Sequence, residues 1–558
     1  MPLLLRFVAL GAFVSLSGCS RGDRSSETAD TTETGHTTAS CSSFTETESA
    51  GFVVTSLGAV RGQRQDNGAW SFRGIPFAEP PTGSRRWTAP EPLTCFPDQP
   101  LDADALGAKC AQRNLFGQEE GSEDCLTLNV WAPESYRRGD ARPTLVYIHG
   151  GANTSGSAGD RLDASGALLF DGRHLAADHG AVVVTIQYRL GPFGFLALPE
   201  LSEENGVAGN YALLDQIAAL QWVRDHIDGF GGDPEQVMVF GESAGGYNVC
   251  TLLATPAAEG LFSSAIVQSG SCAAETLAVV EAQHSEVVDQ IAACQGSDPL
   301  LSCLRELPPS VLLGALPGSV ELPGSPDDGL TYGAVIDGKL VAQDPLEMLR
   351  DGSQNPVPLV VGSNADEMEI PFLIPQDIVD EAGYRDWLEQ TTTTWGPKAA
   401  DTLQGAYPLD AFDSPQDAIA QVLTDLLFTC PARDIVRAFA EGQAGRPEPV
   451  PVWRYLFSRR ARNASGEVLP AIHTAELRYV FGTLVDGVDP VTPIDESLAR
   501  SMGARWVGLS ASGEPTASVP WPEYELERES YLEFGDSEQV GDKLRNARCD
   551  AWATVRGG

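Results

Sequence analysis

Positive charge is scarce in this chain of 558 residues. Lys and Arg together number 37 against 77 Asp and Glu, which gives a formal net charge of −40. A chain this acidic repels nucleic acid and anionic lipid surfaces, so both are excluded as partners. No internal repeat is apparent, and no apolar run is long enough to span a bilayer as a helix. We therefore expect membrane contact only through an anchor at the N-terminus.

The first 18 residues have the pattern of an export signal. Arg6 precedes a short apolar run, residues 7–16, and the signal ends in the sequence Leu-Ser-Gly-Cys at Cys19. This ending resembles the bacterial lipobox, in which the cysteine becomes the lipidated first residue of the mature protein. A plain secretory signal with an incidental cysteine is the alternative. Ser20 after the cysteine suits delivery to an outer membrane where the host has one.

Residues 19–50 predict an anchor cysteine followed by a flexible tether. The segment consists mostly of Ser, Thr, Glu, Asp and Gly, and it has too little apolar surface to offset the entropy of ordering. The sequence thus predicts an exported protein that is lipid-anchored to a bacterial membrane or extracellular. Its eleven cysteines predict disulfides in that setting. Ten remain if Cys19 carries lipid, and their connectivity does not follow from sequence alone.

After residue 50, short β-rich runs alternate with helical stretches, which predicts a mostly parallel sheet covered by helices. Four apolar runs that end in Gly-rich turns are typical of buried parallel strands. Residues 211–223 have the apolar spacing of an amphipathic helix. Ligands of such sheets bind beyond the carboxyl ends of the strands. The four runs are residues 144–148, 181–186, 237–240 and 358–361.

The third run leads directly into Gly-Glu-Ser-Ala-Gly at residues 241–245. This is the nucleophile-elbow pattern, in which small residues two before and two after the serine allow a sharp turn that exposes its hydroxyl. The pattern alone is weak, but here a β-branched strand precedes it and a helix-compatible segment follows. Ser243 is therefore the predicted nucleophile.

Histidine is also scarce, and this scarcity identifies the general base. Hydrolases with this elbow place their catalytic groups in the chain order Ser, acid, His. Of the seven histidines only His284 and His473 follow Ser243. His284 follows too closely for an acid-bearing strand to intervene, so His473 is the predicted base.

The acid must lie between Ser243 and His473. Glu367 follows the fourth apolar run, where a loop would aim it at His473, and spacing alone does not exclude the adjacent Asp366. The sequence His-Gly-Gly-Ala at residues 149–152 follows the first run and fits a glycine loop that supplies backbone N–H groups to an oxyanion. The N–H of Ala244 supplies another.

Long motifs spread over nearly the whole chain resemble the type-B carboxylesterases, the family that includes the cholinesterases and the fungal lipases similar to them. The resemblance implies an α/β-hydrolase fold over residues 51–556, an acyl-enzyme mechanism on small-molecule esters, and neither metal nor cofactor. It also implies Glu367 rather than Asp366 as the acid, and Gly151, Ala152 and Ala244 as oxyanion donors. The motifs are residues 72–81, 123–130, 188–195, 241–246, 362–367 and 473–476.

The same resemblance implies three disulfides. Cys41, Cys95, Cys250 and Cys272 stay unassigned, and a buried thiol on the helix after Ser243 is one interpretation of Cys250. The implied pairs are Cys110–Cys125, Cys294–Cys303 and Cys430–Cys549.

Two departures from the family pattern bear on substrates. Ala152 replaces the third glycine of the usual His-Gly-Gly-Gly and narrows the floor of the site, and Asn153 replaces a common aromatic. Residues 111–122 lack the tryptophan that binds quaternary ammonium in cholinesterases and offer only Phe116 and the cation Arg113. We therefore expect small to medium neutral esters as substrates.

Two other functions remain open at this stage. One is a catalytically weak, cholinesterase-like binding or adhesion protein, because some relatives have lost the serine. The other is a lipase on longer acyl chains, which would differ only in its lid and acyl pocket. The complete set of catalytic residues favours an enzyme over the binding protein. No obligate protein partner is evident.

Overall fold

The computed structural model describes residues 41, 49, 51–114, 117–162, 166–206, 208–319, 330–371, 373–463, 465–484 and 490–557. The predicted export signal, Cys19, nearly all of the tether and Phe116 lie outside these residues. No helix within the described ranges is long and apolar enough to cross a lipid bilayer.

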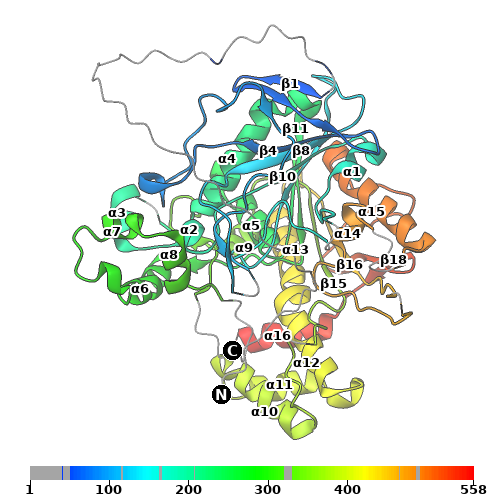
Figure 1. The fold of residues 1–558 in the computed structure, drawn as a ribbon. Helices are drawn as coiled ribbons and strands as arrows, with labels where there is room; N and C mark the ends of the chain where they lie inside the picture. Colours follow the sequence, from blue (N-terminus) through cyan, green and yellow to red (C-terminus); the bar gives the residue numbers. More distant parts are fainter. Residues whose placement is uncertain are drawn as a thin grey trace.

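A sheet of eleven strands runs through the described part of the chain (Figure 1). Seven strands that are adjacent in space, from β10 to β17, are parallel to one another. Antiparallel strands extend the sheet at both edges. The prediction of a large, mostly parallel sheet is confirmed. In spatial order the strands are β18 (Glu538–Asp542), β17 (Ser530–Phe534), β16 (Val452–Phe457), β15 (Leu359–Asn364), β12 (Ser264–Gln268), β11 (Gly232–Glu242), β9 (Arg142–Ile148), β10 (Val182–Ile186), β8 (Thr127–Ala132), β4 (Trp70–Pro76) and β3 (Gln63–Arg64).

The four predicted strands correspond to β9, β10, β11 and β15, all in the parallel part of the sheet. They are apolar throughout because both faces of the sheet are covered. In β9, Val146 and Ile148 pack into the core on one face, whereas Leu145 and Tyr147 pack into a second core on the other. The alternation follows from the two-residue period of a strand.

Helices cover both faces of the sheet. One core includes side chains of α4, α5, α9 and α13, and the other includes side chains of α1, α14 and α15. The predicted helix at residues 211–223 lies within α4. The helices are α1 (Arg173–His179), α2 (Gly191–Phe195), α3 (Pro199–Asn205), α4 (Tyr211–His226), α5 (Ala244–Leu253), α6 (Leu277–Val288), α7 (Leu300–Glu306), α8 (Pro309–Ala315), α9 (Pro345–Asp351), α10 (Glu381–Thr391), α11 (Ala399–Ala406), α12 (Pro415–Thr424), α13 (Cys430–Gln443), α14 (Leu477–Val480), α15 (Pro493–Ser512) and α16 (Asn546–Arg556).

Smaller elements surround this framework. Helices α10, α11, α12 and α16 gather around a third apolar core beyond one end of the sheet (Figure 1), and a π-helix at Asp425–Thr429 joins α12 to α13. The minor sheets are β1 (Phe52–Thr55) with β2 (Gly58–Arg61) and β5 (Leu101–Asp102), β6 (Gln112–Arg113) with β7 (Glu119–Glu120), and β13 (Glu275–Thr276) with β14 (Val335–Ile336).

Five disulfides join the described cysteines. Three are the pairs that the family resemblance implied: Cys110–Cys125, Cys294–Cys303 and Cys430–Cys549. The four cysteines left unassigned form the other two, Cys41–Cys95 and Cys250–Cys272. Cys250 is therefore bridged rather than a buried thiol. These bridges use ten of the eleven cysteines of the chain, and the remaining one is Cys19.

The Cys430–Cys549 bridge, which joins α13 to α16 across 119 residues, should stabilise the fold more than a short-range bridge does. The chain-entropy model assigns such a loop about 5 kcal/mol and the nine-residue separation of Cys294–Cys303 about 2.6 kcal/mol. We expect the double Cys→Ser variant at 430 and 549 to lower the free energy of unfolding more than the matched pair at 294 and 303. Denaturant unfolding measures both, and peptide mapping that found Cys430 and Cys549 as free thiols would refute the pairing.

Candidate active site

The predicted nucleophile lies on a strained turn between β11 and α5. Ser243 has φ +56° and ψ −125°, a backbone conformation that costs a non-glycine residue about 1–3 kcal/mol. Its N–H donates to Gln268 O at 2.9 Å, at the end of the neighbouring strand β12. A side chain at Gly245 would overlap the carbonyl oxygen of Ile148 at the end of β9. The turn therefore forms only where glycine lets α5 start against these strand ends.

The predicted base and acid are in direct contact. His473 Nδ1 lies 2.7 Å from Glu367 Oε2. The backbone N–H of His473 also donates to the backbone carbonyl oxygen of Glu367 at 3.0 Å. The other carboxyl oxygen of Glu367, which is fully buried, accepts from Asn364 N at 2.7 Å and from Ser269 Oγ at 2.6 Å. These bonds leave one oxygen to orient the imidazole, as an acid of this type requires.

The opposite edge of the imidazole faces the nucleophile turn. His473 Nε2 lies 3.2 Å from Oε1 of Glu242, the residue before Ser243, and the ring of Phe428 in the π-helix packs on the imidazole at 4.6 Å between centroids. Burial alone would lower the pKa of His473, but the negative charges of Glu242 and Glu367 outweigh it and raise this pKa to about 9. The site therefore strengthens the base.

A group of buried acids around the imidazole was not predicted from the sequence. Burial raises the pKa of Glu242 to about 8, and the charge of nearby His473 opposes that rise. Burial also raises the pKa of Glu476 to about 7, and that side chain accepts from Gln268 Nε2 at 2.9 Å and Asn364 Nδ2 at 2.6 Å. Both glutamates lie in family motifs, at residues 241–246 and 473–476, but no spacing rule shows that they face His473.

Neither Asp366, the alternative acid, nor His284, the other histidine that follows Ser243, belongs to the cluster around His473. Asp366 pairs with Arg460 at 2.7 and 2.9 Å and accepts from Ala471 N at 2.9 Å, so it joins the two loops that carry Glu367 and the base. His284 lies on α6, where its Nδ1 accepts from Ala197 N at 3.0 Å. Burial lowers the pKa of His284 to about 4.

The predicted oxyanion loop follows β9 as three successive left-handed residues, Gly151, Ala152 and Asn153, with φ of 109°, 53° and 56°. The turn is closed by the N–H groups of Thr154 and Ser155, which both donate to Gly151 O at 3.0 Å. A Cβ at Gly150 would lie 2.9 Å from Cβ of Ser243. The loop thus runs directly against the nucleophile turn. No acceptor within the described residues takes the N–H of Gly151, Ala152 or Ala244.

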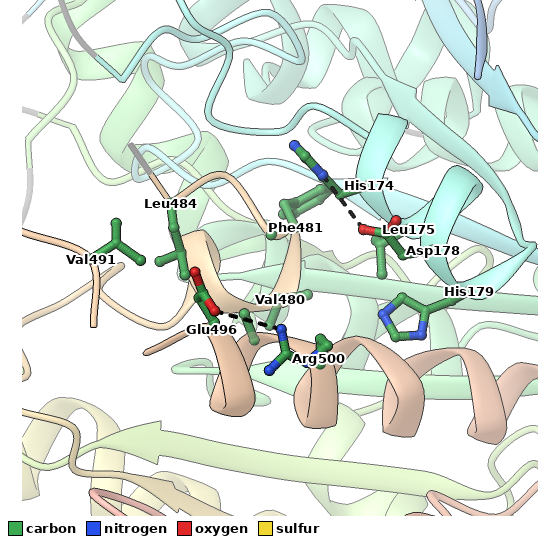
Figure 2. Close-up of a pocket in the computed structure, with 12 residues that line it drawn as sticks. His174, Leu175, Asp178, His179, Val480, Phe481, Leu484, Val491, Glu496 and Arg500 are labelled. Carbon is green, nitrogen blue, oxygen red and sulfur yellow. Dashed lines mark ion pairs between the residues drawn. The ribbon is translucent and has the colours of Figure 1, made fainter. Parts of the chain in front are cut away.

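A separate cavity of about 420 Å³ lies between α1, α14 and α15 (Figure 2). Its rim carries two ion pairs, His174–Asp178 at 3.6 Å and Glu496–Arg500 at 3.9 Å. None of the predicted triad or oxyanion residues lines it, so it is distinct from the site around Ser243. The described residues contain no group of three or more His, Cys, Asp or Glu that could hold a metal ion.

Comparisons with known proteins show the family of this chain. The model of the carboxylesterase family matches residues 49–552. The chain is 34% identical to the para-nitrobenzyl esterase of Bacillus subtilis (strain 168), and the aligned region covers 86% of this chain and 94% of that protein. It is 33% identical to the human cocaine esterase, covering 91% and 90%.

Solved structures show the same similarity. A PNB esterase structure, 32% identical, superposes with a TM-score of 0.75 over 90% of this chain and 100% of its own. A Geobacillus stearothermophilus carboxylesterase, 31% identical, reaches 0.74 with the same coverage. The strand order, the turn at residue 243 and these matches together place the chain in the carboxylesterase family, as a type-B serine ester hydrolase with the α/β-hydrolase fold.

Proposed function

We propose that the protein hydrolyses small to medium neutral carboxylic esters through an acyl-enzyme on Ser243. The observation that supports this most directly is the position of His473, which contacts Glu367 through Nδ1 at 2.7 Å and presents Nε2 to the turn that carries Ser243. This is the arrangement by which a base is oriented toward a serine nucleophile.

The reaction proceeds in two displacements. His473 Nε2 takes the proton of Ser243 Oγ as this oxygen attacks the ester carbonyl, and the N–H groups of Gly151, Ala152 and Ala244 stabilise the oxyanion. The imidazolium then donates the proton to the alcohol as the ester C–O bond breaks. Water attacks the acyl-enzyme with His473 again as the base, and the carboxylic acid leaves as Ser243 recovers its proton.

Glu367 and Glu242 act differently in this scheme. Glu367 keeps the imidazole in the tautomer that leaves Nε2 free to accept a proton, and it stabilises the imidazolium. Glu242, whose Oε1 lies 3.2 Å from His473 Nε2, adds negative charge that favours the imidazolium and so raises the pKa of His473. His473 accepts a proton only when neutral, and its raised pKa therefore places full activity on the alkaline side of neutrality.

The triad assignment predicts an order of effects. Ser243→Ala should remove nearly all turnover of p-nitrophenyl acetate, and Glu367→Gln should lower kcat far more than Asp366→Asn, because Glu367 contacts His473 whereas Asp366 pairs with Arg460. Removal of a triad member costs about 10⁴-fold or more in kcat. Steady-state kinetics on folded variants measures this. The reverse order would assign the acid to Asp366, and a Ser243→Ala protein with half its activity would refute the mechanism.

The described residues support a preference for neutral over choline esters. All ten tryptophans pack in the three apolar cores. Arg113, in the segment where cholinesterases carry their choline-binding tryptophan, pairs with Glu119 at 3.1 Å across the β6–β7 hairpin. The relative from Bacillus subtilis is named for para-nitrobenzyl esters, which are neutral. Within the described residues, a choline group would therefore lack a free indole surface, a contact that stabilises such a cation by about 2 kcal/mol when desolvated.

We therefore expect 3,3-dimethylbutyl acetate, the neutral isostere of acetylcholine, to be cleaved with the higher kcat/KM of the two at physiological salt. A series of p-nitrophenyl esters from acetate to palmitate, with Ser243→Ala as the blank, separates an esterase from a lipase. Rates should peak between acetate and hexanoate. A tenfold preference for acetylcholine would contradict the neutral-ester assignment, and a peak at long chains would assign a lipase.

We also propose the domain organisation expected from the sequence: an export signal at residues 1–18, a lipidated Cys19 with a tether to residue 50, and one hydrolase domain over residues 51–556. The five disulfides support export, because such bridges persist in oxidising compartments. They also leave Cys19 as the one cysteine outside the bridges.

Cys19→Ala should move the exported protein from the detergent phase to the aqueous phase in a Triton X-114 partition. The reason is that an acyl anchor supplies the apolar surface that holds the protein at a membrane. Ser20→Ala serves as the matched control and should stay in the detergent phase. Equal partitioning of the wild type and Cys19→Ala would mean that the cysteine carries no lipid.

A further inference from the structure

Two buried asparagines lie behind the proposed oxyanion hole. Asn153 directly follows Ala152 in the loop after β9, and Asn248 lies on α5 four residues after Ala244. Because residues four apart share one face of a helix, Asn248 sits one turn below Ala244. Both side chains are almost fully buried, with 2% and 3% of their surface exposed. Each asparagine is thus attached to one of the two segments that supply the proposed donors.

The two side chains are joined by a hydrogen bond. Asn248 Nδ2 donates to Asn153 Oδ1 at 3.0 Å. The orientation of the Asn153 amide is set by its other partner, since its Nδ2 donates at 3.1 Å to Tyr332 O, which can only accept. The Asn153 carbonyl oxygen must therefore face Asn248. The hydroxyl oxygen of Tyr188 lies 3.5 Å from Asn153 Oδ1. This hydroxyl donates to His149 O, at the start of the loop, at 2.7 Å.

The oxyanion loop depends on contacts such as this hydrogen bond to keep its conformation. Gly151, Ala152 and Asn153 all have left-handed backbone conformations, which residues other than glycine and asparagine rarely adopt. Such a loop keeps its shape only when its surroundings hold it. The Asn153 backbone is held as well, because Gly191 N donates to Asn153 O at 2.7 Å. The bond to Asn248 connects this loop to the helix that begins at the nucleophile.

We propose that Asn153 and Asn248 are positioning residues that hold the two halves of the oxyanion hole in register, the Gly151–Ala152 loop and the N-terminus of α5. The inference rests on the proposed function. Oxyanion donors act only when they are fixed at the place where negative charge develops, and loss of one donor typically costs 10²–10³-fold in kcat. A donor that is displaced rather than lost costs less. Breaking the bond should therefore lower kcat by about tenfold or more and change KM little.

The test compares Asn153→Ala, Asn248→Ala and the double variant, using p-nitrophenyl acetate and an aryl trifluoromethyl ketone, which forms an oxyanion adduct with the serine. Both single variants should lose about tenfold or more in kcat and a similar factor in ketone affinity, with KM within about threefold. Because one shared bond is broken in each case, the double variant should be little worse than either single variant. Should Asn248→Ala fail to fold, Asn248→Asp replaces it, since it keeps the shape but puts an acceptor opposite Asn153 Oδ1.

Asn355→Ala is the matched control. Asn355 is also buried, and its side chain donates to Leu252 O at 3.0 Å and Thr255 O at 3.3 Å, at the far end of α5. This variant should lower Tm but leave kcat and ketone affinity within about twofold of the wild type. A loss of kcat in Asn355→Ala as large as in Asn248→Ala would reduce the effect to general destabilisation of α5 and overturn the proposal.

Two further results would also overturn the proposal: kcat and ketone affinity within twofold of the wild type in both single variants, or fully additive losses in the double variant. Ser243→Ala, assayed alongside, separates this inference from the proposed function. An inactive Ser243→Ala protein beside a fully active Asn248→Ala protein would refute only the positioning role. An active Ser243→Ala protein would refute the proposed function itself.

Discussion

The close approach of the turn at Ser243 to the carboxyl ends of β9 and β12 is the constraint on which the active site depends. The turn has a left-handed backbone at a non-glycine residue, and α5 can begin there only because Gly245 has no side chain to meet Ile148 O. The parallel sheet brings the strand ends together at one edge. Once they meet, the oxyanion loop after β9 and the acid after β15 lie at the same edge as the nucleophile.

Charge is the second constraint, because several ionisable groups are buried together. Glu242, Glu367 and Glu476 surround a single imidazole, and burial raises the pKa of Glu242 and Glu476. Such a group is stable only if some of its members stay neutral or receive hydrogen bonds. Amide groups of Gln268 and Asn364 supply these bonds to Glu476. The arrangement concentrates basicity on His473, where an ester hydrolase needs it.

Several elements of the fold could be predicted because they depend on local pattern. The runs at residues 144–148 and 358–361 are apolar on both faces, and they became β9 and β15 in the parallel part of the sheet. The antiparallel strands at the edges, such as β3 and β18, are short or partly exposed and carry no such continuous run. The Cys250–Cys272 pairing could not be predicted either, because it depends on how close α5 comes to the segment after β12.

The sequence by itself determined the type of chemistry. The elbow at residues 241–245 and the position of His473 after it in a chain with seven histidines are properties of order and residue type, and these are readable in one dimension. Only the tertiary structure decided which neighbours those residues meet. It turned Asp366 toward Arg460, placed Glu242 against the imidazole and joined the oxyanion loop to α5 through two asparagines. The physical reason is that these contacts join residues 94, 95 and 231 positions apart in the chain, and their distances follow from the packing of the whole sheet and not from any local pattern.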